Sequence, residues 1–250
     1  IEAEVEKHGS DSDKECLAYV LHGNAGSNAT EWPHAGNRRM DIFDDPTKAD
    51  GRAGQPLAFF VNHAKAKQAG LLEEHVIALR LYTTATYAAL NDPLRGFGAR
   101  ATKKGEPHPF PITISFIADG IRRLRAVAAS DEDAQQPRDF WRGIRNIELP
   151  QLFLEEGGTE FAPMSTSLDF HVALAYSDKA EKRLLFKVAT SSFMERGADL
   201  QWLSAFPGEV EFLYPPLTFL QPTGREEEVL AEVGGASPIK YRVMEVTPRI

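Results

Sequence analysis

The sequence predicts an α+β protein in which a helical part precedes a strand-rich part. Between residues 71 and 128, apolar side chains recur at spacings of three and four, which is the period of a helix. Beyond residue 136 they alternate with a period of two, which indicates strands. Because the helices come first and the strands second, the order favours α+β over an alternating βαβ protein.

These changes of pattern divide the chain into three regions. Residues 1–70 are an N-terminal extension rich in Gly, Asn and Asp, for which we expect mostly loops and short elements. Residues 71–135 are expected to form a helical lobe, and residues 136–250 a strand-rich core. The polar stretch SDEDAQQPRD, residues 130–139, is expected to link the two.

Two helices are predicted within residues 71–135. The first is expected to end at the Asn-Asp-Pro of residues 91–93, and the second to begin after Pro111. The apolar stripe of the first helix comprises Leu72, Val76, Leu79, Thr83, Thr86 and Leu90. That of the second comprises Ile117, Ile121, Leu124 and Ala128.

Strands are predicted at three places in the C-terminal region. They are DFWRGIRNI (139–147), RLLFKVAT (183–190) and EVEFLYPPLTFLQP (209–222). In the second of these, Leu184, Phe186 and Val188 alternate with other residues and are expected to share one buried face.

Composition excludes several classes of protein. The 250 residues carry a net charge of −8, which makes general binding to nucleic acid backbones unfavourable. No apolar run approaches the roughly 18 residues of a membrane span. Cys16 is the single cysteine, which excludes an intramolecular disulfide and favours a reducing, cytoplasmic setting. We expect that Ile1 is not the natural N-terminus. The sequence predicts no definite compartment and no oligomeric state.

One stretch suggests a different enzyme class. LAYVLHGNAGSN, residues 17–28, resembles the oxyanion-hole segment of some α/β-hydrolases. That fold also needs a G-x-S-x-G turn for its nucleophile, and the nearest sequence, GASPI at 235–239, lacks the last glycine. We therefore interpret the segment as a Gly/Asn-rich loop.

Arg142 lies inside the apolar strand sequence FWRGI. Burying a guanidinium costs several kcal/mol unless an anion pairs with it. Two partners fit this requirement: a carboxylate of the same chain, or the phosphate of a ligand, which a guanidinium binds bidentately.

Three consecutive hydroxyl residues, Ser165, Thr166 and Ser167, precede a short helical pattern. Thr166 and Asp169 match a capping box, so helix capping explains part of the motif. Three hydroxyls exceed what one cap requires, and the remaining ones are available to orient another group.

Two glutamates stand two positions apart in a strand-like sequence. Strand geometry predicts that Glu209 and Glu211 share one face, with Val210 and Phe212 on the other, and that the two carboxylates lie roughly 7 Å apart. Like charges on one face repel each other. The alternatives are an exposed polar face and a site that binds positive charge between the two.

Taken together, Arg142, Ser165–Ser167 and the Glu209-x-Glu211 pair resemble the arginine, Ser-Thr-Ser, Glu-x-Glu signature of the arginine-specific mono-ADP-ribosyltransferases. That family includes vertebrate ecto-enzymes and bacterial toxins. The resemblance implies the family's fold, a helical N-terminal lobe packed on a β-sandwich-like core of two sheets.

The similarity extends beyond the three motifs. GADLQWLSAFPGEVEFLYPP, residues 197–216, resembles the family's loop and strand around the glutamates, including the Pro-Pro that follows. LRLYTTATYAALNDPLR, residues 79–95, resembles a helix of its N-terminal lobe. The resemblance covers residues 71–221, and the disulfides of the ecto-enzymes have no counterpart here.

The resemblance implies transfer of ADP-ribose from NAD to an arginine of a target protein, with NAD or NADP as the substrate and no metal. Loss of nicotinamide leaves an oxocarbenium-like sugar, so catalysis requires negative charge beside it. Glu211 would supply that charge, and Ser165 would hold Glu211 in place. Glu209 would bind the acceptor guanidinium and draw off a proton.

The remaining roles also follow from the resemblance. Arg142 would hold the NAD phosphates, and the backbone of Gly143 would meet the nicotinamide amide. Thr166 and Ser167 would support the strand-to-helix turn beside the dinucleotide. Tyr176 is the candidate aromatic over nicotinamide.

The loop SAFPG, residues 204–208, would recognise the acceptor through Phe206, whose ring packs on the target arginine.

Two alternative functions are compatible with the same fold. One is an NAD glycohydrolase, in which water replaces arginine, and the other is a catalytically silent module that binds NAD or a protein. Intact Arg142, Ser165 and Glu211 argue against the silent module.

Overall fold

The structure is a computed structural model that describes residues 1–23, 55–145, 148–177, 183–232 and 238–250. The chain divides into two compact units. The helical unit comprises Ile1–Val127 together with Leu200–Gly208, and the strand unit comprises Ala128–Asp199 with Glu209–Ile250. The boundary lies close to the polar link predicted from the sequence. The return of residues 200–208 to the helical unit was not predicted.

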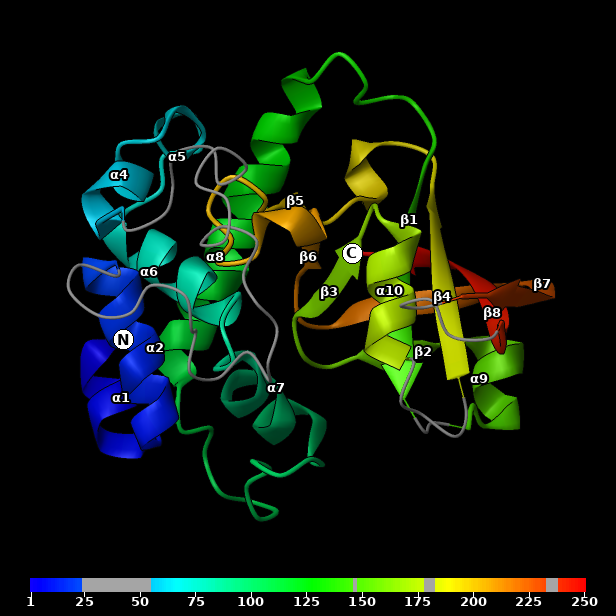
Figure 1. The fold of residues 1–250 in the computed structure, drawn as a ribbon, viewed down its shortest axis with the longest axis horizontal. Coiled ribbons are helices and arrows are strands. Elements are labelled where there is room, and N and C mark those ends of the chain that lie inside the picture. Colours follow the sequence, from blue (N-terminus) through cyan, green and yellow to red (C-terminus); the bar gives the residue numbers. More distant parts are fainter. Residues whose placement is uncertain (24–54, 146–147, 178–182, 233–237) are drawn as a thin grey trace. The chain divides into compact units, whose positions relative to one another are not determined.

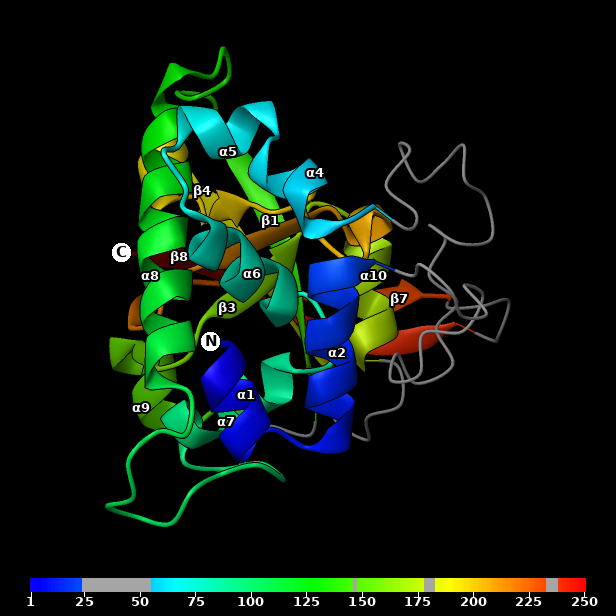
Figure 2. The same cartoon turned by 90° about the vertical axis from the view of Figure 1, so that its left-hand side faces the viewer.

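The described part of the helical unit consists of helices (Figure 1). They are α1 (Glu2–His8), α2 (Asp11–His22), α4 (Leu57–Val61), α5 (Ala64–Gln68), α6 (Glu73–Tyr82), α7 (Tyr87–Arg95) and α8 (Pro111–Val127). Figure 2 shows α8 beside α6, against which it packs. Of the helices described, none combines the length and the apolar character that a membrane span requires.

The first 22 residues form two helices where loops and short elements were expected. Ser10 begins α2 with a capping box, because its hydroxyl accepts from the Asp13 amide and the Asp13 carboxylate accepts from the Ser10 amide. Val5, Leu17 and Val20 are buried. The hydrolase interpretation required a strand at residues 17–21, which α2 occupies instead; the Gly/Asn-rich part of that motif lies mostly outside the described residues.

The single helix predicted over residues 72–90 is wrong, because the chain forms two helices here. Thr83 and Thr84 turn their hydroxyls back onto carbonyls of the last turn of α6, at 2.7 and 2.6 Å, and the helix stops. Helix α7 then includes Pro93 and ends at Gly96, whose φ of 69° suits a left-handed cap. The second predicted helix is confirmed as α8.

The strand unit is built on one mixed sheet with the strand order β2-β7-β8-β4-β1-β3-β6-β5. Its strands are β1 (Arg138–Arg145), β2 (Gly158–Glu160), β3 (Met164–Ser167), β4 (Arg183–Thr190), β5 (Ala198–Asp199), β6 (Glu211–Tyr214), β7 (Thr218–Ala231) and β8 (Ile239–Arg249). Its helices are α9 (Gln151–Glu156), α10 (Phe170–Ser177) and the 3₁₀ turns η1 (Ala128–Ser130) and η2 (Phe193–Glu195). A third 3₁₀ turn, η3 (Pro207–Glu209), begins in the helical unit and ends at the first residue of the strand unit after it. Neighbouring strands are antiparallel except β4 and β8, which are parallel.

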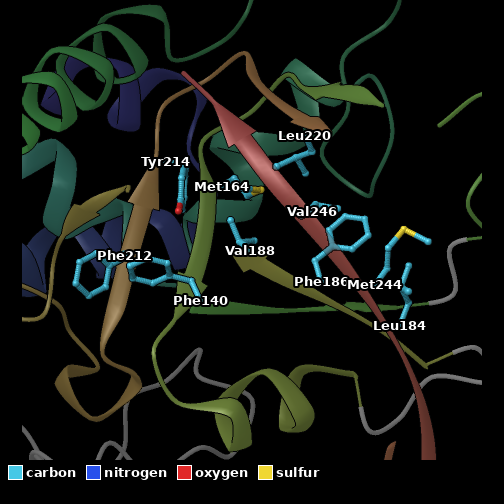
Figure 3. Packing of buried hydrophobic residues seen from close by; sticks show 10 residues of the cluster. All are labelled: Phe140, Met164, Leu184, Phe186, Val188, Phe212, Tyr214, Leu220, Met244 and Val246. Carbon is cyan, nitrogen blue, oxygen red and sulfur yellow. The ribbon is translucent and has the colours of Figure 1, made fainter. Parts of the chain in front are cut away.

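One face of this sheet carries a buried cluster drawn from six strands (Figure 3). Its members are Phe140, Met164, Leu184, Phe186, Val188, Phe212, Tyr214, Leu220, Met244 and Val246. The predicted alternation in β4 is confirmed, because Leu184, Phe186 and Val188 lie in this cluster while Leu185 belongs to a second one under α10. The two faces of the sheet are therefore both covered.

The α+β class is confirmed, but the predicted two sheets are one continuous hydrogen-bonded sheet. Its strands nevertheless bend over their own core. Arg142 on β1 forms an ion pair of 3.7 Å with Glu160 on β2, although three strands separate β1 from β2 in the hydrogen-bonded order. The sandwich-like form thus arises from the curvature of a single sheet, as twist and coiling of long strands produce.

Helix α10 packs on the sheet face opposite the cluster of Figure 3, over β1 (Figure 1). Gly143 permits this approach. A Cβ atom at this position would lie 2.2 Å from the carbonyl oxygen of Ala173 and 3.0 Å from the Cβ of Tyr176. Both distances are shorter than van der Waals contact, so the absence of a side chain sets how closely α10 lies on β1.

We therefore predict that Gly143→Ala destabilises the protein by about 2 kcal/mol, because overpacking displaces α10. The urea midpoint measures the effect, with the exposed substitution Ser130→Ala in the same unit as control. An unchanged midpoint for Gly143→Ala would show that the helix moves away at no cost.

Candidate active site

The pairing of β3 with β6 brings the hydroxyl motif and the second glutamate together. In this antiparallel pair Ser167 lies opposite Glu211, and Ser165 lies opposite Leu213. Ser165 and Glu211 are therefore diagonal neighbours on one face of the pair. The Ser165 hydroxyl donates a hydrogen bond to the Glu211 carboxylate. Two weak motifs 46 residues apart thus meet in one site.

Glu211 is a buried carboxylate, with 8% of its surface exposed. Burial, reinforced by the negative charge of Glu209 and opposed by the hydrogen bond from Ser165, raises the pKa of Glu211 to about 7. A carboxyl group in this state changes charge near neutral pH and gains strongly from a cation placed beside it.

The predicted strand geometry of the two glutamates is wrong, because only Glu211 belongs to β6. Glu209 ends the 3₁₀ turn η3, and Val210 between them has a φ of 44°. A β-branched residue adopts this left-handed conformation at a cost of about 1–3 kcal/mol. Its neighbours hold it there, since the Ser167 hydroxyl donates to the Glu209 carbonyl at 2.6 Å and the Leu168 amide donates to the Val210 carbonyl.

The capping box predicted for Thr166 and Asp169 does not form. Thr166 lies in β3, and its hydroxyl donates to the Phe212 carbonyl at 3.0 Å. Asp169 caps α10 with its own carboxylate, which accepts from the His171 amide at 2.8 Å. The three hydroxyls are therefore distributed among three acceptors on and beside β6, which ties the motif to the glutamates.

Arg142 has partners within the strand unit. It donates to the Ser165 carbonyl at 2.7 Å and pairs with Glu160 at 3.7 Å. About a fifth of each charged side chain is exposed, so an incoming anion can reach the guanidinium. Sequence reasoning anticipated a carboxylate partner for Arg142 but did not identify Glu160, because the curvature of the sheet makes this contact.

Tyr176 on α10 reaches the other glutamate. Its hydroxyl lies 3.1 and 3.3 Å from the two carboxylate oxygens of Glu209. Gly143 lies beneath the same turn of the helix. No local pattern indicated this hydrogen bond, since 33 residues separate the two side chains.

Phe206 belongs to the segment 200–208 of the helical unit and is half-buried. Helix α6 holds this segment: Arg80 donates to the Leu203 carbonyl at 2.7 Å, and the Thr83 hydroxyl accepts from the Ala205 amide at 2.9 Å. The Arg80 guanidinium also lies 3.6 Å from the centre of the Phe60 ring. The loop that precedes Glu209 is therefore fixed on a helix and is not a free connection.

Within the strand unit, the structure thus gathers most of the residues singled out from the sequence. Hydrogen bonds or close packing link Arg142, Gly143, Ser165, Ser167, Tyr176, Glu209 and Glu211, and Thr166 joins them through β6. The structure adds two residues that the sequence did not indicate as part of the site: Glu160, which pairs with Arg142, and Val210, which has the left-handed φ.

Comparison with known proteins shows which proteins this chain is similar to. The family model described as NAD:arginine ADP-ribosyltransferase matches residues 51–234. Ecto-ADP-ribosyltransferase 5 from Bos taurus is 27% identical over 150 residues, which cover 59% of this chain and 44% of the bovine protein. The chain therefore spans less than half the length of this curated relative.

Solved structures share the fold. The ADP-ribosyltransferase HopU1 of Pseudomonas syringae pv. Tomato DC3000 superposes with a TM-score of 0.54 at 16% identity, covering 96% of this chain and 98% of HopU1. Plx2a, an ADP-ribosyltransferase toxin from Paenibacillus larvae, gives a TM-score of 0.53 at 16% identity over 78% of this chain and 95% of the toxin.

The raised pKa of Glu211 predicts a measurable effect on stability. Ionising this carboxyl is harder in the folded protein than in the unfolded chain, so it favours folding below pH 4.5, and that contribution is lost as the pH rises to about 7. Replacing Glu211 with Gln removes the effect. The stability of Glu211→Gln relative to the parent should therefore increase by about 2 kcal/mol between about pH 5 and pH 8.

Urea denaturation at the two pH values measures this difference. Ser165→Ala is the matched control, since it removes the hydrogen bond that favours the ionised carboxylate and should enlarge the loss of stability with pH. A Glu211→Gln difference that does not change with pH would contradict the burial of the charge.

Proposed function

The chain belongs to the NAD:arginine ADP-ribosyltransferase family, and we propose that it transfers ADP-ribose from NAD to an arginine side chain of a protein. The observation that carries this proposal is the carboxylate pair: Glu211 is buried and bound by Ser165, and Glu209 stands two residues away with its own partner, Tyr176. Two carboxylates, each held by its own hydrogen-bond donor, suit a reaction that involves two positively charged groups, the sugar of the transition state and the acceptor guanidinium.

Glu211 stabilises the sugar in this proposal. The bond between the ribose C1′ and the nicotinamide nitrogen breaks, nicotinamide leaves with the electron pair, and the ribose becomes oxocarbenium-like. A carboxylate shielded from water interacts strongly with such a cation, because the surrounding dielectric is low. Ser165 keeps the carboxylate in one orientation before the reaction, so it does not have to reorganise during the reaction.

Glu209 serves the acceptor. An arginine guanidinium is protonated in water and is a poor nucleophile. A carboxylate that binds it brings one nitrogen to the sugar and receives the proton as the new bond between C1′ and nitrogen forms. Its place outside β6, created by η3 and the φ of Val210, supports a function separate from that of Glu211.

The remaining residues bind NAD. The partly exposed Arg142 guanidinium holds the NAD phosphates. In the protein without NAD, Arg142 forms its ion pair with Glu160. The backbone of Gly143 meets the nicotinamide amide, and the ring of Tyr176 covers nicotinamide. Thr166 and Ser167 keep β3 in register with β6 beside the dinucleotide.

The loop before Glu209 selects the acceptor. Its Phe206 is half-buried, and hydrogen bonds from α6 hold the surrounding segment. A defined aromatic ring offers a surface on which a guanidinium stacks. We propose that a protein with an accessible arginine is the partner.

Substitutions of the two glutamates are predicted to affect different activities. Glu211→Gln should abolish nicotinamide release from NAD, at least a hundred-fold by order of magnitude, because the cation loses its counter-charge. Glu209→Gln should lose transfer to agmatine, a small arginine analogue, but keep NAD hydrolysis. Nicotinamide release and the agmatine adduct are measured together by mass spectrometry.

Release by the parent protein that ignores agmatine would favour an NAD glycohydrolase instead. Full turnover in Glu211→Gln would sink the assignment of Glu211. Equal losses of transfer and hydrolysis in Glu209→Gln would refute the division of roles.

Catalysis should also depend on pH through Glu211. Since the ionised carboxylate is the active form and its pKa is raised to about 7, kcat/KM for NAD should rise with pH and level off above this value. Ser165→Ala should move the midpoint to higher pH, and Glu209→Gln should move it lower by removing a neighbouring negative charge. The pH profile of nicotinamide release tests both shifts, and a flat profile would contradict them.

A further inference from the structure

The carboxylate of Glu209 has a partner that its proposed role does not explain. The Tyr176 hydroxyl lies 3.1 Å from one carboxylate oxygen and 3.3 Å from the other. A single hydroxyl proton is thus shared between both oxygens of the group. Glu209 is held from α10, whereas Glu211 is held from β3, so the two carboxylates of the pair are oriented by different elements.

Tyr176 is itself firmly placed. Its helix, α10, packs on β1, where the Cβ of Tyr176 approaches the position that a side chain on Gly143 would need. Neighbouring residues of the helix, Ala173 and Leu174, are buried in the cluster beneath it. Because the helix is packed in place, the Tyr176 hydroxyl lies at a defined position, and the direction of its hydrogen bond is fixed.

The backbone at Glu209 supports the same arrangement. Its carbonyl accepts from the Ser167 hydroxyl, and the next residue, Val210, takes a left-handed φ of 44°. These features turn the chain out of β6 just before Glu211. The side chain of Glu209 then meets Tyr176 instead of lying along the strand beside Glu211.

The chemistry of the pair is asymmetric. A phenol keeps its proton at neutral pH and is therefore a donor, while an ionised carboxylate only accepts. A hydrogen bond from a neutral donor favours the ionised form of the acceptor. Each carboxylate oxygen has two lone pairs, so a carboxylate that accepts from a hydroxyl can also accept from a guanidinium, which binds it best through two parallel hydrogen bonds.

We propose that Tyr176 is a positioning residue for the acceptor: its hydroxyl orients the Glu209 carboxylate towards the incoming guanidinium and thereby sets how ADP-ribose is divided between arginine and water. This inference rests on the proposed transferase function. It assigns to the hydroxyl a task distinct from that of the aromatic ring, and it makes Gly143, through α10, part of the support of the acceptor carboxylate.

Tyr176→Phe isolates the hydroxyl, since it retains the ring and its packing. With agmatine as the acceptor, kcat/KM for adduct formation should fall about ten-fold, the usual effect of losing one hydrogen bond to a charged group. NAD hydrolysis without agmatine is measured in the same variant and should fall less than adduct formation does, because Glu211 and Ser165 are untouched. The ratio of adduct to ADP-ribose should therefore fall.

A double-mutant cycle with Glu209→Gln excludes a merely structural effect. If the hydroxyl acts through the carboxylate, Tyr176→Phe should change adduct formation by less than about two-fold when Glu209 is already Gln. Tyr87→Phe, an exposed tyrosine on α7, is the matched control and should behave as the parent. Thermal melting of each variant accompanies the kinetics.

Three results would overturn the inference. They are an unchanged adduct ratio in Tyr176→Phe, a parallel loss of transfer and hydrolysis, and a rise in transfer, which would mean that the hydroxyl competes with the acceptor. Each of these requires a parent protein that transfers ADP-ribose to agmatine. A parent that forms no adduct overturns the proposed function and this inference with it, so the two failures are distinguishable.

Discussion

The burial of one carboxylate beside β3 is the constraint on which the rest of the strand unit depends. Glu211 occupies a buried position in β6, and an ionised group there is stable only with a donor close by. Ser165 supplies that donor from the neighbouring strand. The antiparallel register of β3 and β6 is therefore as much a property of the site as of the fold, since a slip of one residue would turn the hydroxyl to the other face.

A second consequence concerns the like charge nearby. Placed along one strand, two glutamates would repel each other on a shared face and destabilise it. The chain avoids this by ending η3 at Glu209 and by forcing Val210 into a left-handed conformation, so that each carboxylate has its own hydrogen-bond donor. Local strain at Val210 is the cost of separating two groups that the proposed reaction requires near each other.

The elements around Glu209 and Glu211 have two different structural roles. The curved sheet supplies a rigid frame, through a core drawn from six strands and through contacts such as that of Arg142 with Glu160. Helix α10 supplies Tyr176, which binds Glu209, and the segment held by α6 supplies Phe206. Changes in acceptor preference are therefore expected in these two segments before they appear in the sheet.

The sequence by itself determined the α+β class, helix α8 and the strands β1 and β4, and it indicated which residues to propose for the site, because periodicity and the order of short motifs are local properties of a chain. Only the tertiary structure decided the rest. The break after α6 depends on the direction in which Thr83 and Thr84 turn their hydroxyls. The single curved sheet and the partners Glu160 and Tyr176 depend on contacts between residues far apart in sequence, which no local pattern encodes.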